Sequence, residues 1–117
     1  MGVAGQAGLV AFVGHNGLMD FELDWQAKVE ASAARRDAVA LCCMSRDYFL
    51  QKIRALNGRG VLLTNGLMAP EAYVLESAIN DWSRGRDKAA LRENAAAQYH
   101  KFQKCGMTAA RRLFYSE

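Results

Sequence analysis

Two short apolar runs, each ending abruptly in small or polar residues, limit what this chain can fold into. Residues 8–13 read Gly-Leu-Val-Ala-Phe-Val and lead into Gly-His-Asn-Gly, and residues 37–42 read Asp-Ala-Val-Ala-Leu-Cys and lead into Cys-Met-Ser. Continuous apolar runs of this length are typical of parallel strands that are buried on both faces. Reactive groups and ligands gather just beyond the carboxyl ends of such strands. If the two runs are neighbouring parallel strands, His15 and Cys43 lie at one edge of a sheet.

The rest of the chain alternates between helical and strand patterns. We expect Ser45 to cap the first helix, because a serine side chain commonly accepts from the free N–H groups of a first turn. The order of the elements predicts an α/β fold, a three-layer sandwich around a mainly parallel sheet. The expected strands are residues 8–13, 37–42 and 60–64, and the expected helices are residues 46–56, 70–84, 87–104 and 108–115.

Two segments between the first strands are less regular. Residues 18–24 alternate apolar and acidic residues in their second half, which predicts a short half-exposed strand or a hairpin arm. Residues 25–36 are polar and alanine-rich and form either a loop or a modest helix. Three strands are fewer than a sheet of this class usually has. We therefore expect residues 1–117 to be a single α/β domain that is either the C-terminal part of a larger domain or the partner of a second copy.

Composition restricts the compartment and the partners. The 117 residues are 51% apolar and 23% charged, as in globular domains, and the net charge of +3 is too small and too dispersed to indicate a nucleic-acid partner. Neither a basic leader nor an apolar stretch of about 20 residues is present, so we expect a soluble, cytoplasmic protein with no membrane partner. Three cysteines, an odd number, indicate free thiols in a reducing compartment.

The residues at the two strand ends have chemistry of their own. His15 stands in a glycine-containing turn, where an imidazole can act as a general acid or base, although a turn histidine that only bonds the backbone is the alternative. Cys43 lies just before a helix N-terminus, which favours a thiolate, and a nearby imidazole favours it further. The alternative for Cys42 and Cys43 is that both are small buried hydrophobic residues. We expect Cys42 to be buried and Cys43 to lie at the edge.

Metal and cofactor sites have no support in the spacing of the residues. Paired ligands such as Cys-x-x-Cys or His-x-x-x-His are missing, so His15, Asp20, Cys43 and His100 do not predict a metal centre. The Gly-His-Asn-Gly turn also lacks the pattern of a phosphate-binding loop. We therefore expect neither a metal nor a cofactor.

The two strand ends together resemble those of the caspase-like cysteine peptidases, which include caspases, metacaspases and the bacterial CHAT-type and gingipain-type relatives. In that family one apolar strand ends in Ser-Gly-His-Gly, and another ends in Asp-Ala-Cys-x-Ser-Gly. The resemblance makes Cys43 the nucleophile and His15 the general acid/base, and in layout it extends over residues 8–105. Four positions depart from the pattern: Asn16 and Arg46 replace glycines, and Leu41-Cys42 replaces Asp-Ala. The opening strand and helix of the family have no counterpart.

The resemblance implies a cysteine peptidase that acts on a peptide or protein substrate. Backbone N–H groups near Asn16, Gly17 and Cys43 would stabilise the oxyanion. Asn65 and Gly66, after the third strand, would lie near the pocket for the substrate residue before the scissile bond (P1). Asp20 or Asp24 would either orient His15 or bind a basic P1 side chain. A second hypothesis from another class is a non-catalytic α/β interaction module, or a degenerate peptidase-like fragment, that forms a homodimer or binds a partner chain.

Overall fold

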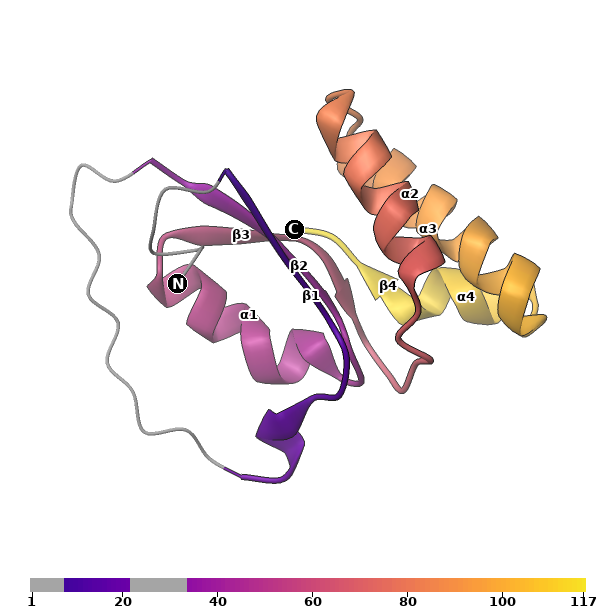
Figure 1. Ribbon diagram of the computed structural model, residues 1–117, viewed down its shortest axis with the longest axis horizontal. Coiled ribbons are helices and arrows are strands. Elements are labelled where there is room, and N and C mark those ends of the chain that lie inside the picture. The colour runs from indigo at the N-terminus through magenta and orange to yellow at the C-terminus, as the bar shows by residue number, and fades with distance from the viewer. Residues whose placement is uncertain (1–7, 22–33) are drawn as a thin grey trace.

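The computed structural model describes residues 8–21 and 34–117, and its core is a four-stranded sheet with helices on both faces (Figure 1). The α/β class and the mainly parallel sheet are confirmed. The elements in chain order are β1 (Leu9–Val13), the 3-10 helix η1 (Gly17–Met19), β2 (Arg36–Leu41), α1 (Ser45–Ala55), β3 (Gly58–Thr64), α2 (Ala72–Ser83), α3 (Lys88–Gln103), α4 (Met107–Leu113) and β4 (Phe114–Tyr115).

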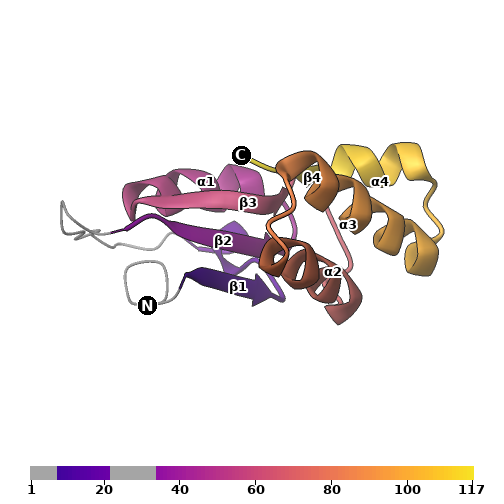
Figure 2. The same ribbon diagram turned by 90° about the horizontal axis from the view of Figure 1, so that it is seen from above.

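The strands lie in the order β1-β2-β3-β4, and Figure 2 shows the first three side by side. β1 pairs with β2 and β2 with β3 in parallel, whereas β3 pairs with β4 antiparallel. The register of the first pair places Leu9 opposite Asp37 and Val13 opposite Leu41. The carboxyl ends of β1 and β2 therefore meet at the same edge of the sheet.

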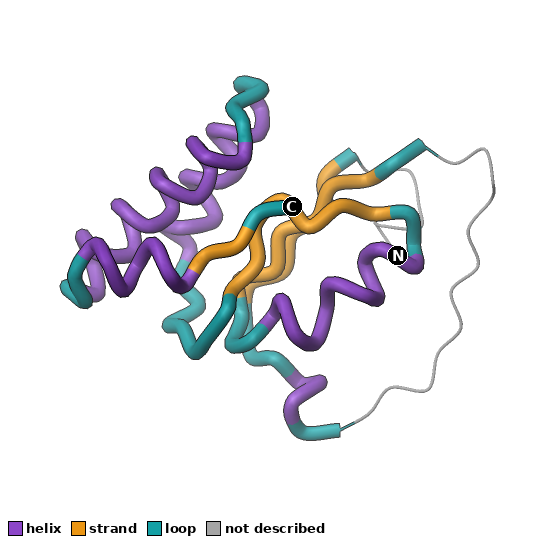
Figure 3. The backbone as a smooth tube through the Cα atoms, turned by 180° about the vertical axis from the view of Figure 1, so that it is seen from behind, coloured by secondary structure: helices purple, strands orange, loops and turns teal. Residues whose placement is uncertain are grey.

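Two hydrophobic cores fill the spaces above and below the sheet. Val39 and Leu41 of β2 pack with α2, α3 and α4, and the alternate residues Ala38, Ala40 and Cys42 pack with α1. Figure 3 shows the strands between α1 and the other three helices. Because β2 is covered on both faces, it needs apolar residues at successive positions, which is why it reads as a continuous run.

The helices on the second face pack through small side chains, and an aromatic pair joins α3 to β4. Ala95 and Ala96 of α3 and Ala110 of α4 are fully buried, which lets the two helices approach closely. The ring of Tyr99 meets that of Phe114 edge-on, with 5.8 Å between the ring centres. Phe114 thereby joins β4 to this core. No helix in the described part of the chain is long and apolar enough to cross a membrane.

Three expectations about the elements are wrong. Residues 18–20 form part of η1 and its C-cap rather than a strand, because the Asn16 side chain accepts from the N–H of Leu18 and starts a tight helical turn. The last helix ends at Leu113, and the next two residues form β4, which the apolar pattern did not indicate. Ser45 does not cap α1, since Met44 is the N-cap residue and the serine side chain turns into the sheet. Residues 22–33 lie outside the described residues.

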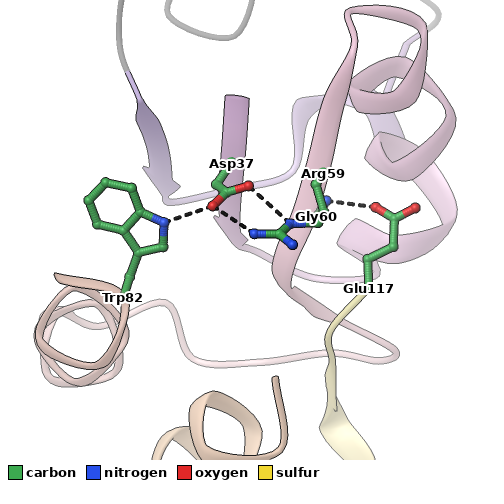
Figure 4. Close-up of polar contacts among 5 residues, drawn as sticks. All are labelled: Asp37, Arg59, Gly60, Trp82 and Glu117. Carbon is green, nitrogen blue, oxygen red and sulfur yellow. Dashed lines mark hydrogen bonds and ion pairs between the residues drawn. The ribbon is translucent and has the colours of Figure 1, made fainter. Parts of the chain in front are cut away.

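A group of polar contacts holds the opposite, amino-terminal edge of the sheet together (Figure 4). The carboxylate of Asp37 accepts from the indole N–H of Trp82 at 2.8 Å and from two nitrogens of Arg59 at 3.0 and 3.1 Å. The carboxylate of Glu117 accepts from the backbone N–H of Gly60 at 2.8 Å. These contacts fasten α2 and the C-terminal segment to β2 and β3, and their donors and acceptors already have partners.

Candidate active site at the carboxyl edge of the sheet

The first two strands bring the predicted residues to one edge. The backbone N–H of Gly14 donates to the carbonyl of Leu41 at 3.3 Å, so the pairing of β1 with β2 continues beyond Val13. His15 and Cys43 each follow the paired residues Val13 and Leu41 by two positions. The parallel neighbours on which the sequence interpretation depends are therefore present.

Cys43 lies half-buried in the turn between β2 and α1. Its Sγ atom is 3.4 Å from the backbone N of Met68 and 3.5 Å from the carbonyl oxygen of the same residue. The next residue, Met44, has a left-handed backbone (φ 55°), and its N–H donates to the carbonyl of Gly66 at 2.8 Å. The loop after β3 thus fixes the turn through backbone groups. α1 begins two residues later, at Ser45, so Cys43 is close along the chain to the positive end of that helix dipole.

Cys42 and Cys43 differ as expected. Cys42 is fully buried on the α1 side, and burial, followed by the neighbouring Cys43, raises the pKa of the Cys42 thiol to about 11. At neutral pH this sulfur therefore keeps its proton and is a poor nucleophile. Cys105 is exposed and distant in sequence, and all three cysteines are free. The structure therefore leaves Cys43 as the edge thiol, with Cys105 as a natural internal reference for reactivity.

His15 is exposed and already has a carboxylate partner. Its Nε2 atom is 2.6 Å from Oδ2 of Asp20, and the two side chains are 72% and 64% exposed. This is the contact expected if Asp20 orients the imidazole. Within residues 8–21 and 34–117, no hydrogen bond joins the ring to Sγ of Cys43, so the thiol and the imidazole share an edge without a direct bond. Asp24 lies outside the described residues.

Asn16 has a role that residue-by-residue reasoning missed. Its side chain is fully buried, its Nδ2 donates to the carbonyl of Cys43 at 2.7 Å, and its Oδ1 accepts from the N–H of Leu18 at 3.0 Å. The sequence interpretation considered only its backbone N–H, as an oxyanion donor beside Gly17. An asparagine ahead of a turn is a signal for the cap. The contact with Cys43, 27 positions away, leaves no local signal.

A second buried polar pair lies directly behind the Cys43 turn. The backbone N–H of Ser45 donates to the hydroxyl of Thr64 at 3.1 Å, and the backbone N–H of Thr64 donates to the hydroxyl of Ser45 at 2.8 Å. The serine hydroxyl donates to the carbonyl of Ala40 at 2.7 Å, and the threonine hydroxyl donates to that of Cys42. The start of α1 is therefore bonded to the ends of both β2 and β3.

The residues predicted for a substrate pocket adjoin the same turn. Gly66 accepts from Met44, as described above, and Oδ1 of Asn65 accepts from Arg46 at 3.2 Å. The guanidinium of Arg46 also lies 4.1 Å from the ring centre of Tyr115. Which substrate, if any, these residues bind stays a prediction.

The part of the chain that the structure describes holds no group of three or more histidine, cysteine or acidic side chains able to bind a metal.

No family model matches the chain, and no curated protein or solved structure proves similar to it. The functional argument therefore depends on the geometry of the carboxyl edge and on the residues in it.

Proposed function

We propose that this protein is a cysteine peptidase of caspase-like type, with Cys43 as nucleophile and His15 as general acid/base. The observation that carries the proposal is the register of β1 and β2, which sets the two residues at equivalent positions beyond two adjacent parallel strands. Cys42 does not fit the role of nucleophile, because it is buried and only Cys43 of the adjacent cysteine pair is accessible.

The proposed reaction is acyl transfer. The thiolate of Cys43 attacks the carbonyl carbon of a peptide bond, the C–N bond breaks, and the leaving amine takes a proton from His15. Water then attacks the thioester while His15 takes a proton from that water, the C–S bond breaks, and the acid leaves with the thiolate and the protonated imidazole restored. Asp20, at 2.6 Å from the imidazole, orients the ring and stabilises its protonated form, which is present before the amine leaves and again after the water is deprotonated. Backbone N–H groups of Asn16, Gly17 and Cys43 are the candidate donors to the oxyanion.

The test uses the three cysteines as their own controls. The folded chain is treated with three peptide chloromethyl ketones whose P1 residues are Arg, Asp and Leu, and the labelled sulfur is located by mass spectrometry. We expect at least one ketone to label Cys43 faster than the more exposed Cys105. His15→Ala should slow this labelling by about 10²- to 10⁴-fold, the usual contribution of a general acid or base. His100→Ala, which removes the other histidine, is the matched control.

Two results would contradict the peptidase. One is labelling that simply follows exposure, with Cys105 ahead of Cys43 for every ketone. The other is a rate at Cys43 that is the same in His15→Ala and His100→Ala.

The outer edge of β1 favours a second candidate, an interaction module that pairs with a copy of itself. The carbonyl of Gly8 and the N–H of Gly14 face β2, so by alternation the N–H and C=O groups of Leu9, Ala11 and Val13 face outward. Among the described residues, none pairs with this apolar edge. An edge without lysine or proline is a template for another strand.

Sedimentation velocity tests this second candidate. Ala11→Pro removes one outward N–H group without touching the pairing to β2, and Ala11→Ser keeps the N–H group. If copies pair through β1, the proline variant shifts toward the monomer and the serine variant does not. A wild-type chain that sediments as a monomer at every concentration would reject strand pairing.

A further inference from the structure

The buried amide of Asn16 connects the two turns that carry the candidate nucleophile and base. Its Nδ2 donates to the carbonyl of Cys43, and its Oδ1 caps η1 through the N–H of Leu18. We infer that Asn16 is a positioning residue, whose side chain sets the His15 turn and the Cys43 turn relative to each other. This inference rests on the proposed function and adds a residue to it.

On the cysteine side, Asn16 completes a set of contacts that fix the thiol. The carbonyl of Cys43 is held by Asn16, its Sγ lies against the backbone of Met68, and the N–H of the following Met44 is held by Gly66. Consecutive groups of the turn are thus bonded to the loops after β1 and after β3. If the bond to Asn16 is lost, the Cys43 carbonyl is no longer tied to the β1 side, and the direction of the Cα–Cβ bond is less restricted.

On the histidine side, the same amide organises the segment that holds the imidazole. By capping η1, Asn16 fixes the turn in which the N–H of Asp20 donates to the carbonyl of Gly17 at 3.0 Å. That turn brings the Asp20 carboxylate to the ring of His15. One side chain therefore aligns the thiol from one end and the imidazole–carboxylate pair from the other.

The chemistry of the amide makes the two contacts separable. Only a group with both an N–H and an oxygen at the right separation satisfies a carbonyl and an N–H at once. Asn16→Ser keeps an oxygen that can cap η1, but its shorter side chain does not reach the Cys43 carbonyl. The serine variant therefore cuts the link between the strands and leaves the cap. Asn80→Ser, at an exposed position of α2, is the matched control.

The experiment compares two probes of Cys43 on the full chain. Iodoacetamide needs only an accessible thiolate, whereas the peptide chloromethyl ketone that best labels the wild type also needs the substrate-like alignment of thiol and imidazole. We expect Asn16→Ser to slow the ketone by about 10- to 100-fold, the effect of a misplacement near 1 Å, and to change the iodoacetamide rate by less than about threefold. Asn80→Ser should change neither rate. In the His15→Ala background, Asn16→Ser should cause no further loss, because it acts through the alignment of the pair.

The outcomes separate this inference from the proposed function. If His15→Ala slows the ketone but Asn16→Ser does not, or slows both probes equally, Asn16 is not a positioning residue and the peptidase proposal stands. If His15→Ala has no effect, the peptidase proposal fails and the inference fails with it. Iodoacetamide labelling of the buried Cys42 reports unfolding of the variant. If Asn16→Ser unfolds, Asn16→Asp tests the inference instead. The aspartate has the same size and keeps the oxygen that caps η1, but when ionised it has no N–H to donate to the Cys43 carbonyl. Its expected pattern is the same, with Asn80→Asp as control.

Discussion

The reciprocal contacts of Ser45 and Thr64 give a sharp prediction for stability. Each hydroxyl accepts from the other residue's backbone N–H and donates its one proton to a carbonyl of the β2 segment. Both side chains are fully buried. Thr64→Val preserves the shape of the side chain and removes the hydroxyl, so the N–H of Ser45 and the carbonyl of Cys42 both lose this partner.

The size of the effect follows from those two groups. A buried donor or acceptor that loses its partner costs about 1–3 kcal/mol, so we expect Thr64→Val to lower the free energy of unfolding by about 2–6 kcal/mol. Ser45→Ala removes the hydrogen-bond partner of the Thr64 N–H and of the Ala40 carbonyl. It should therefore lower the free energy of unfolding by a similar amount. The two hydroxyl oxygens are 3.1 Å apart. The double variant should therefore lose less than the sum of the single variants, by about 0.5–3 kcal/mol.

Urea unfolding followed by circular dichroism measures these changes. Thr108→Val is the matched control, because it makes the same chemical change at the exposed second threonine of the chain and should stay within about 0.5 kcal/mol of the wild type. A loss of less than about 1 kcal/mol for Thr64→Val, or one equal to that of the control, would refute the reasoning. Full additivity of the two single variants would refute the coupling between the hydroxyls.

Three further predictions concern titration and the amino-terminal edge. Burial raises the pKa of Cys42 in the folded protein to about 11 from 9.0. The stability that the buried neutral thiol provides is therefore complete below pH 9, and about 3 kcal/mol of it is lost as the pH rises to 11. The urea midpoint of Cys42→Ala should fall less over this pH range than that of the wild type. Burial raises the pKa of Glu117, but the hydrogen bond from the Gly60 N–H and the Arg54 guanidinium outweigh burial and lower this pKa below its ordinary 4.5. The ionised carboxylate therefore stabilises the fold above that pH, and this stability is lost as the pH falls. Glu117→Gln should weaken the decline in melting temperature at acid pH, and an unchanged decline would contradict this. Asp37→Asn should destabilise the fold by about 1–3 kcal/mol in urea unfolding, and a neutral result would show that the contacts in Figure 4 do not stabilise that edge.

The strands that are buried on both faces were the most predictable elements, and the short edge strand was the least. β2 and β3 were predicted to within about two residues, because burial on both faces requires continuous apolar runs, and β1 was predicted equally well from its apolar run although Ala11 and Phe12 are exposed. β4 has two residues, and its pairing with Leu63 and Thr64 depends on a segment about 50 positions away, so nothing local distinguishes it from the end of a helix. The positions of His15 and Cys43 beyond the ends of β1 and β2 follow directly from the parallel pairing.

The polar contacts of the edge were harder to predict than its strands. A local rule assigned Ser45 to the cap of α1, but Thr64, 19 positions later, offers it a buried partner, and a buried pair outweighs an exposed cap. The alternation of residues 18–24 suggested a strand, whereas the cap from Asn16 selected a turn over the described part of that segment. In both cases the residue that decides the structure, Thr64 or Asn16, lies outside the segment whose pattern gave the prediction.

The distribution of buried polar side chains bears on the choice between the two functions. Among residues 8–21 and 34–117, four polar or charged side chains are buried, and three of them, Asn16, Ser45 and Thr64, bond to residues 40–45 or to each other around the Cys43 turn. Burying polar groups is favourable only if every one is satisfied, and it restricts the backbone more than apolar packing does. A module that pairs through the outer edge of β1 needs no such restriction at residues 42–45, whereas a nucleophile must be held within a fraction of an ångström. The placement of these side chains therefore favours chemistry at Cys43 over strand pairing, and it makes the comparison of Asn16→Ser with Asn80→Ser more informative than a change at the exposed His15 alone.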